Sequence, residues 1–220
     1  MQWLYGLVKE KGETSHDVVN RLRRITGIKR IGHAGTLDPL ATGVLVVGIT
    51  REGTKRLESL KSSGKAYDAI ITLGATSETD DAEGKKTEWA DVKRPTLLQI
   101  KKTCASFVGI IELTPPIYSA IKIRGKAAYR YARKGKELVL AARPSKIYSI
   151  RVLKYRWPLL SIRVKTGSGV YVRSLAREIG NRLMTGAYVS ELTRTRVGSY
   201  TLAKATTIDQ FATLWHAQKV

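Results

Sequence analysis

The sequence contains one cysteine, Cys104, and three histidines among its 220 residues. A single cysteine cannot close an internal disulfide, and the scattered histidines lack the spacing of a zinc site. No apolar run reaches the roughly 20 residues that a membrane-spanning helix requires. The first twelve residues also lack the charged-then-apolar pattern of an export signal. These absences argue against a disulfide-stabilised secreted domain, a zinc protein and a membrane span, and they predict a cytoplasmic location.

Acidic residues are also scarce relative to basic ones. The chain has 18 Asp and Glu against 39 Lys and Arg, a formal net charge of +21. Such an excess of one sign repels itself, and a bound polyanion relieves the repulsion, so nucleic acid is the first partner to consider and an acidic membrane the second. The basic residues are spread from Lys9 to Lys219, which favours a basic surface on a folded scaffold over a charged tail.

No internal repeat, low-complexity tract or Gly/Ser-rich linker interrupts the chain. Because 43% of the residues are hydrophobic, a chain of this length can bury a substantial core. We therefore expect a single catalytic domain over residues 1–220. The expected strands and helices follow one another without strict βαβ alternation, which predicts an α+β (mixed α/β) fold with a central, mostly antiparallel sheet flanked by helices and loops.

Local patterns predict the individual elements. A capping-box pattern of Thr14 with Asp17 predicts a helix up to Gly27, and apolar runs predict strands at 44–49 and 67–73. Further along, the patterns predict a helix from Pro95 to Gly109, a short helix at 127–134 ended by Gly135, an antiparallel pair at 148–152 and 160–164, a helix at 172–183 directly after Tyr171, and a last strand at 197–202.

The most informative segment is Gly32–Pro39, which reads GHAGTLDP. It places one carboxylate, Asp38, in a glycine-bracketed loop ahead of a strand. An aspartate before proline prefers an extended backbone and is often only a turn former. Against that interpretation, Gly35 and Gly43 allow another backbone to approach closely, and His33 offers an aromatic cation in the same loop. The spacing alone leaves both interpretations open.

Two other patterns only resemble known sites. Residues 48–55 read GITREGTK, close to a phosphate-binding P-loop, but the final lysine and hydroxyl residue are in swapped order. Residues 167–169 read GSG and lack the third glycine of a dinucleotide-binding fingerprint. Neither segment predicts nucleotide binding, and no Ser/His/Asp arrangement is evident.

The sequence resembles a known family in several segments that occur in the family's order. IGHAGTLDPLATGVLVV, residues 31–47, resembles the active-site motif of the TruB family of tRNA pseudouridine synthases. Four further segments resemble the same family: TSHDVVNRLRRITGIKR, KAYDAIITLGATSETDDAEG, LTPPIYSAIKIRGKAAYRYARKG and GVYVRSLAREIG. Together they extend over most of residues 1–202.

The resemblance implies roles for individual residues. Asp38 would act at the ribose carbon, Tyr67 would stack on the target uracil, and Arg173 would be the cation paired with Asp38. The implied substrate or RNA contacts are Tyr171 and Leu192 in the pocket, His33 in the stack vacated by the flipped base, and Gly35, Thr36 and Leu37 in the loop. Simpler interpretations remain open: the tyrosines and Leu192 as core residues, and Arg173 as a surface cation.

The chemistry explains these residue types. Forming pseudouridine breaks the ribose C1′–N1 bond, turns the uracil and bonds C1′ to C5, so one carboxylate can stabilise or capture a sugar cation. A guanidinium nearby offsets desolvation of that carboxylate and keeps it ionised. Extruding a uridine costs a few kcal/mol, and stacking on an aromatic ring returns about 1 to 3 kcal/mol. The reaction needs no metal and no cofactor.

The resemblance therefore implies an isomerase that converts uridine to pseudouridine in the T-loop of tRNA, at position 55. We expect tRNA, through its T-arm, as the partner, with no membrane, no obligate protein partner and a monomeric state. Bacterial members generally carry a C-terminal RNA-binding domain of PUA type, and we expect this chain to lack it. Two alternatives stay open: a non-catalytic RNA-binding or tRNA-folding chaperone, and a pseudouridine synthase that acts on another RNA.

Overall fold

The computed structural model describes residues 3–119, 121–123, 125–132 and 138–217. The chain forms two compact units. Unit 1 comprises Met1–Asp68 and Leu192–Val220, and unit 2 comprises Ala69–Glu191. Two strands, β4 (Lys65–Leu73) and β12 (Ala187–Val197), contribute residues to both units.

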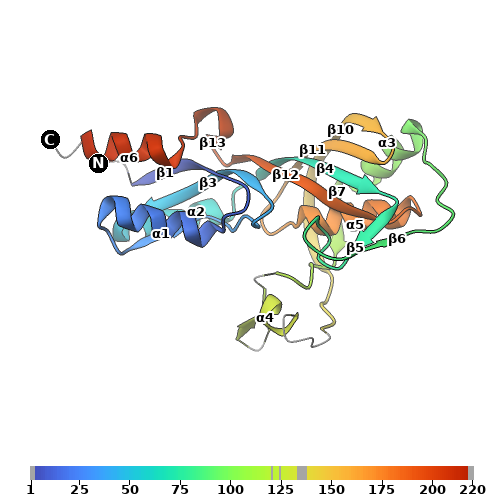
Figure 1. Cartoon of the computed structure of the whole chain (residues 1–220), viewed down its shortest axis with the longest axis horizontal. Helices are drawn as coiled ribbons and strands as arrows, with labels where there is room; N and C mark the ends of the chain where they lie inside the picture. Colours follow the sequence, from blue (N-terminus) through green and yellow to red (C-terminus); the bar gives the residue numbers. More distant parts are fainter. Residues whose placement is uncertain (1–2, 120, 124, 133–137, 218–220) are drawn as a thin grey trace. The chain divides into compact units, whose positions relative to one another are not determined.

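Unit 1 is built around β3 (Figure 1). β3 pairs with β1 and β2 in antiparallel fashion, and β12 joins it in parallel, with Thr193 opposite Thr42 and Arg194 opposite Gly43. The elements of this unit are β1 (Leu4–Lys9), α1 (Ser15–Thr26), β2 (Ile31–His33), β3 (Thr42–Ile49), α2 (Thr50–Lys61), β13 (Tyr200–Thr201), the short 3₁₀ helix η1 (Leu202–Lys204) and α6 (Ile208–Ala217).

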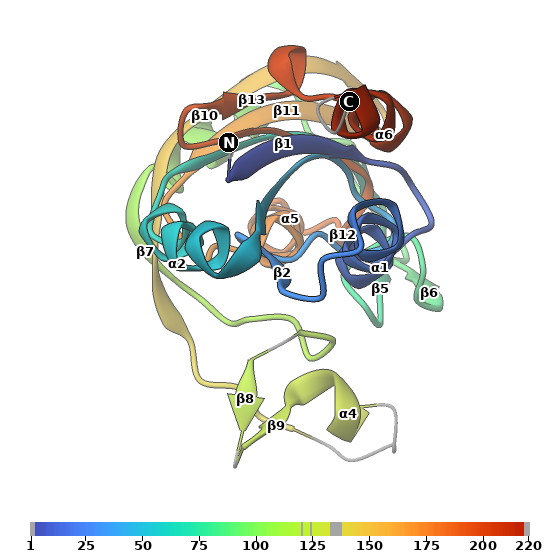
Figure 2. The ribbon, with the colours of Figure 1, turned by 90° about the vertical axis from the view of Figure 1, so that its left-hand side faces the viewer.

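The apolar pattern of α1 and β3 forms the core of unit 1. Val18, Val19 and Leu22 of α1 are buried in one cluster with Leu45 and Val47 of β3, and aromatic residues of α6 complete it. Figure 2 shows α1 and α6 together with the strands of this unit. The predicted capping box is confirmed: Thr14 caps α1 and exchanges hydrogen bonds with Asp17, and Gly27 ends the helix in a left-handed conformation.

Unit 2 contains a longer antiparallel ladder. Strand β10 pairs with β11 on one side and β7 on the other. The elements are β5 (Ala75–Ser77), β6 (Lys86–Glu88), α3 (Leu97–Ser106), β7 (Gly109–Leu113), β8 (Lys122–Ile123), β9 (Lys126–Ala127), α4 (Ala128–Ala132), β10 (Arg143–Arg156), β11 (Leu159–Thr166) and α5 (Val172–Arg182). Figure 2 shows the β8–β9 hairpin beside α4.

Most of the predicted elements are confirmed. The fold is α+β, β3 and β4 contain the strands expected at 44–49 and 67–73, and β10 and β11 form the expected antiparallel pair. Helix α5 begins directly after Tyr171, as predicted. The helix expected from Pro95 is α3, which begins at Leu97 because Thr96 caps it. α4 lies within the helix expected at 127–134, whose predicted end, residues 133–135, lies outside the described residues.

The last strand predicted at 197–202 is confirmed only in part. The long strand β12 ends at Val197, a turn follows, and β13 holds only Tyr200–Thr201 before η1 begins. Gly198 has a positive φ of 55° and makes the tight turn that returns the chain along β12. The apolar pattern continues across this turn, which is why it predicts one strand.

No helix among the described residues is both long enough and apolar enough to cross a bilayer. Within the same residues, no group of three His, Cys, Asp or Glu side chains is placed to hold a metal ion.

Candidate active site

The loop that carries Asp38 connects β2 to β3 in unit 1, and groups from outside the loop hold its backbone. The Ser15 hydroxyl at the start of α1 accepts a hydrogen bond from the backbone N–H of Leu37 at 2.8 Å and donates one to the Leu37 carbonyl at 3.2 Å. The Pro39 carbonyl accepts hydrogen bonds from the Gly12 N–H at 2.8 Å and from the Lys9 ammonium at 3.4 Å. The Asp38 carbonyl accepts one from Ala41 at 3.0 Å.

A buried arginine from β12 holds the start of the loop and the strand that follows the loop. Arg194 is 1% exposed, and its guanidinium donates to the carbonyls of Gly35, Thr36 and Val44 at 3.1, 3.4 and 2.8 Å. Gly35 has a φ of +96°, a conformation that favours glycine. Polar groups from β1, α1 and β12 thus fix the loop, and the Asp38 side chain is half-buried within it.

Tyr67 lies on β4 and is 7% exposed. Burial raises the pKa of its hydroxyl, whereas the charge of Arg194 and a side-chain hydrogen bond to Arg194 act to lower it. Asp38 is also close enough to influence the pKa of this hydroxyl, in the raising direction. Unit 1 therefore brings together two of the three predicted catalytic residues, Asp38 and Tyr67.

Two lysines in this neighbourhood are also buried. Lys9 is fully buried and Lys65 is 9% exposed, and each donates to backbone carbonyls. Burial lowers the pKa of the Lys9 ammonium, although Glu13 and Asp38 oppose that shift. Burial and then the charge of Arg194 lower the pKa of Lys65. Asp38 is therefore set among cationic groups within its own unit.

The other loop residues of the prediction lie near Asp38 in the chain but differ in exposure. His33 ends β2 and is half-buried, Thr36 is exposed, and Leu37 is buried. Burial, and after it the Arg194 charge, lowers the pKa of the His33 imidazole. Leu192 lies on β12 and is 7% exposed. The predicted roles of these residues toward RNA stay predictions.

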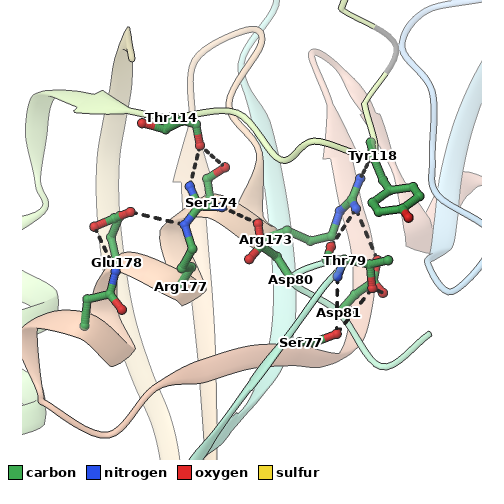
Figure 3. A network of polar contacts seen from close by, with 11 residues as sticks. Ser77, Thr79, Asp80, Asp81, Thr114, Tyr118, Arg173, Ser174, Arg177 and Glu178 are labelled. Carbon is green, nitrogen blue, oxygen red and sulfur yellow. Dashed lines mark hydrogen bonds and ion pairs between the residues drawn. The ribbon is translucent and has the colours of Figure 1, made fainter. Parts of the chain in front are cut away.

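Arg173, the third predicted catalytic residue, belongs to unit 2 and lies on α5 (Figure 3). It is 3% exposed and forms an ion pair with Asp81 at 3.2 Å. Its guanidinium also donates to the carbonyls of Thr79 and Tyr118, both at 2.9 Å. The interpretation of Arg173 as a surface cation is therefore wrong, because the side chain is buried. Its predicted pairing with Asp38 stays a prediction.

A second ion pair lies one helical turn further along α5. Arg177 pairs with Asp80 and also donates to the Thr114 carbonyl at 2.6 Å, and Figure 3 shows the two pairs side by side. Burial raises the pKa of Asp80, opposed first by Arg177 and then by Arg173. These pairs anchor the acidic loop at 78–83 to α5.

Tyr171 directly precedes α5 and is half-buried. It lines an open pocket of about 230 Å³ within unit 2. The other residues that line this pocket are Leu113, Pro115, Ile121, Arg143, Pro144, Ser145, Ser168, Gly169 and Ser174. Asp38, Tyr67 and Leu192 are not among the residues that line it, and the predicted place of Tyr171 in the uracil pocket stays a prediction.

Sequence reasoning missed Arg194 and Asp81. The segment LTRTRVG around Arg194 alternates basic residues with others, which is typical of an exposed strand. The burial of this arginine follows only from the parallel register of β12 with β3. Asp81 belongs to the segment SETDDAEG, which the resemblance already included. Its ion pair joins two segments that are far apart in the sequence, so no local pattern could reveal it.

Two family models match the chain. Residues 23–172 match the model of the TruB family pseudouridylate synthase N-terminal domain, and residues 173–219 match that of the tRNA pseudouridylate synthase B C-terminal domain. The chain belongs to the TruB family of pseudouridylate synthases. The resemblance seen in the sequence is confirmed.

Curated members of this family cover nearly the whole chain. The chain is 46% identical over 206 residues to tRNA pseudouridine synthase B of Corynebacterium glutamicum strain R, covering 92% of this chain and 69% of that protein. It is 42% identical over 212 residues to the protein of the same name from Thermobifida fusca strain YX, covering 93% and 72%.

A solved structure shares the fold. The match is to a structure described as a Cbf5-Nop10-Gar1 complex, with 29% identity and a TM-score of 0.76. It covers 99% of this chain and 56% of that chain. The TruB-family chain described here therefore has the fold of a pseudouridine synthase, as the sequence predicts.

Proposed function

We propose that this chain isomerises uridine to pseudouridine in tRNA, at position 55 of the T-loop by family resemblance. Membership of the TruB family carries the proposal, because the curated relatives are tRNA pseudouridine synthases. The reacting carboxylate is Asp38. We further propose a monomeric cytoplasmic enzyme that contacts the T-arm of its substrate.

The geometry of unit 1 fits this chemistry. The uracil must leave C1′ through N1 and return through C5, and the carboxylate of Asp38 stabilises or captures the sugar cation between these two steps. The C5 hydrogen leaves as a proton and N1 gains one, so no atom is added or lost overall. A loop whose backbone is already hydrogen-bonded holds the carboxylate without reorganisation during the reaction.

Tyr67 and Arg173 complete the proposed machinery. Tyr67 supplies a buried ring on which the extruded uracil stacks, which returns about 1 to 3 kcal/mol of the cost of flipping. Arg173 is the proposed cationic partner of Asp38, and its ion pair with Asp81 holds the guanidinium in a fixed orientation. His33, Tyr171 and Leu192, together with the backbone at Gly35, Thr36 and Leu37, are the proposed contacts to the substrate.

One face of unit 2 supports the proposal that the partner is RNA. The residues from Arg143 to Thr166 include seven Lys and Arg and no Asp or Glu. Along the β10–β11 ladder the buried side chains alternate with exposed ones, and five exposed basic residues form what we call the basic ribbon: Lys146, Arg151, Lys154, Arg156 and Lys165.

The composition of the basic ribbon suits a phosphate backbone. Its five members form no ion pair within the described part of the chain. Four of the cations lie along β10 and Lys165 lies on the neighbouring β11, so the ribbon offers a row of cations along this ladder. Tyr148, 55% exposed, adds an aromatic surface on β10. Such a row binds RNA in a salt-dependent manner.

The test follows tritium released from 5-tritiated uridine in a tRNA transcript, because only bond formation at C5 expels that atom. We expect release by the wild type and none by Asp38→Asn, which removes the charge at nearly constant shape. Binding of the same tRNA, measured by filter retention, should remain within about threefold. Release by the Asn variant would refute the role of Asp38, and a wild type that binds without release would favour the chaperone alternative.

A further inference from the structure

Arg194 is a buried cation whose guanidinium is bound by backbone carbonyls. In the described part of the chain it forms no ion pair, and its polar partners there are backbone carbonyls together with the hydroxyl of Tyr67. A buried charge is costly unless it is well solvated by the protein. Each of its three guanidinium nitrogens donates a hydrogen bond to a carbonyl. These hydrogen bonds offset the cost of burying the charge at 1% exposure.

The three carbonyls lie on both sides of Asp38 along the chain. Gly35 and Thr36 come just before Asp38, and Val44 belongs to β3 after it. The planar guanidinium thus ties the start of the loop to the strand that follows the loop. A shift of the loop in either direction breaks at least one of these hydrogen bonds.

The main chain of Arg194 is placed just as firmly. Arg194 is opposite Gly43 in the parallel β12–β3 ladder, and a Cβ atom at Gly43 would lie 2.3 Å from the Arg194 carbonyl oxygen. Gly43 also has a φ of +105°. Only glycine permits the Arg194 backbone to come this close to residue 43. The strand register that places the guanidinium beside the loop therefore depends on Gly43.

The guanidinium also acts on both proposed catalytic side chains of unit 1. Its charge influences the ionisation of Tyr67, and Asp38 and Tyr67 in turn stabilise its own charged form. The neighbourhood of Asp38 therefore contains a fixed positive charge that does not come from Arg173. Such a charge favours the ionised carboxylate that the proposed reaction requires.

We propose that Arg194 is a positioning residue for the isomerisation, which holds the backbone on both sides of Asp38 and presents a fixed charge to Asp38 and Tyr67. This inference rests on the proposed function. Misplacing a reacting group by about 1 Å can cost about 100-fold in rate. The residue is therefore expected to affect the chemical step more than substrate binding.

The test compares Arg194→Met and Arg194→Lys with the matched control Arg196→Met, which changes an exposed arginine two residues further along the same strand. Single-turnover tritium release from tRNA gives the rate, and its dependence on enzyme concentration gives the affinity. We expect the rate to fall about 100-fold in Arg194→Met, with an intermediate loss in Arg194→Lys. Affinity should stay within about threefold, and Arg196→Met should keep the wild-type rate.

A pH profile separates positioning from a general loss of structure. Without the nearby cation the carboxylate protonates more readily, so the acid limb of the rate profile should move to higher pH in Arg194→Met and much less in Arg194→Lys. Thermal unfolding shows which variants are folded. If Arg194→Met does not fold, Arg194→Lys decides the question. It keeps the charge, but its single nitrogen cannot reach carbonyls that the three separate nitrogens of the guanidinium now bind.

Failure of the proposed function and failure of the role of Arg194 give different results. A wild type without tritium release overturns the proposed function. An active wild type with folded Arg194 variants that keep its rate and its acid limb overturns the role of Arg194 alone. A folded variant that loses affinity but not the single-turnover rate also overturns it, because positioning acts on the bound complex.

Discussion

The position of the Asp38 side chain depends on neighbouring residues that form hydrogen bonds with the backbone of its loop. Ser15, Lys9 and Arg194 each bind main-chain groups of the loop at residues 35–39, so the side chain of Asp38 is presented by a backbone that is already satisfied. A loop fixed in this way loses little entropy when substrate binds. The same buried cations make the surrounding residues sensitive to pH.

His33 provides a test of that sensitivity. Burial, followed by the charge of Arg194, lowers the pKa of its imidazole below the ordinary value of 6.5. Since the unfolded chain takes up the proton at a higher pH, the folded state is favoured above that value and loses stability as the pH falls through it. Between pH 7 and pH 5 the wild type should therefore lose more free energy of unfolding than His33→Gln.

Urea unfolding at the two pH values measures the difference. The exposed residue His216 on α6 provides the control, and His216→Gln should follow the wild type. Equal losses in the wild type and in His33→Gln would show that His33 does not contribute to the acid sensitivity.

Some residues of the site could be predicted from the sequence, and others could not. Asp38 and Tyr67 were identified through long motifs that resemble a family. Arg194 was not, because an arginine in an alternating strand reads as exposed until the register with β3 is known. Burial of a charged side chain is a property of tertiary packing, which no local pattern contains.

At the scale of elements, helices α1 and α3 begin with the same kind of capping box, and α1 also carries a residue that holds the Asp38 loop. Thr14 caps α1, whose first residue, Ser15, holds the loop at Leu37. Thr96 caps α3 with Gln99 in the same manner, and α3 belongs to unit 2, whereas the loop belongs to unit 1.

This pairing gives a matched prediction. Thr14→Ala and Thr96→Ala should each lower the free energy of unfolding by about 1 kcal/mol, which lowers the melting temperature of a chain of this size by roughly 2 to 4 °C. Only Thr14→Ala should also slow tritium release, because it loosens the helix end that carries Ser15. Melting curves and single-turnover rates test both parts, and equal rates in the two variants would contradict the link to the loop.

Two of the elements that sequence patterns missed share a physical cause. Helix α2 is mostly polar, and only Gly53 and Leu57 are buried along its length, so its apolar periodicity is weak. In strand β12 the charged residues Glu191 and Arg194 interrupt the alternation of apolar and polar residues, so the sequence pattern does not indicate a buried strand. By contrast, β3 and β11 have continuous or strictly alternating apolar residues and were predicted.

At the scale of the whole molecule, the net charge of +21 allows two accounts of RNA binding. In one, any Lys or Arg contributes through the overall field. In the other, a particular face supplies the phosphate contacts. Salt dependence distinguishes them, because each phosphate contact that is lost removes about 0.7 to 0.9 from the slope of log affinity against log salt.

The basic ribbon should account for a defined part of that slope. The triple variant Lys146→Ser, Arg151→Ser and Lys154→Ser removes three exposed cations from β10, and we expect the slope to fall by about 2 to 3 with tRNA. The control triple Arg51→Ser, Lys55→Ser and Arg56→Ser removes the same charge from exposed positions of α2. Filter binding from low to high salt measures both. Because the two triples have equal net charge, a common slope would mean that the overall field binds the RNA, whereas a lower slope in the ribbon variant alone locates the phosphate contacts on β10.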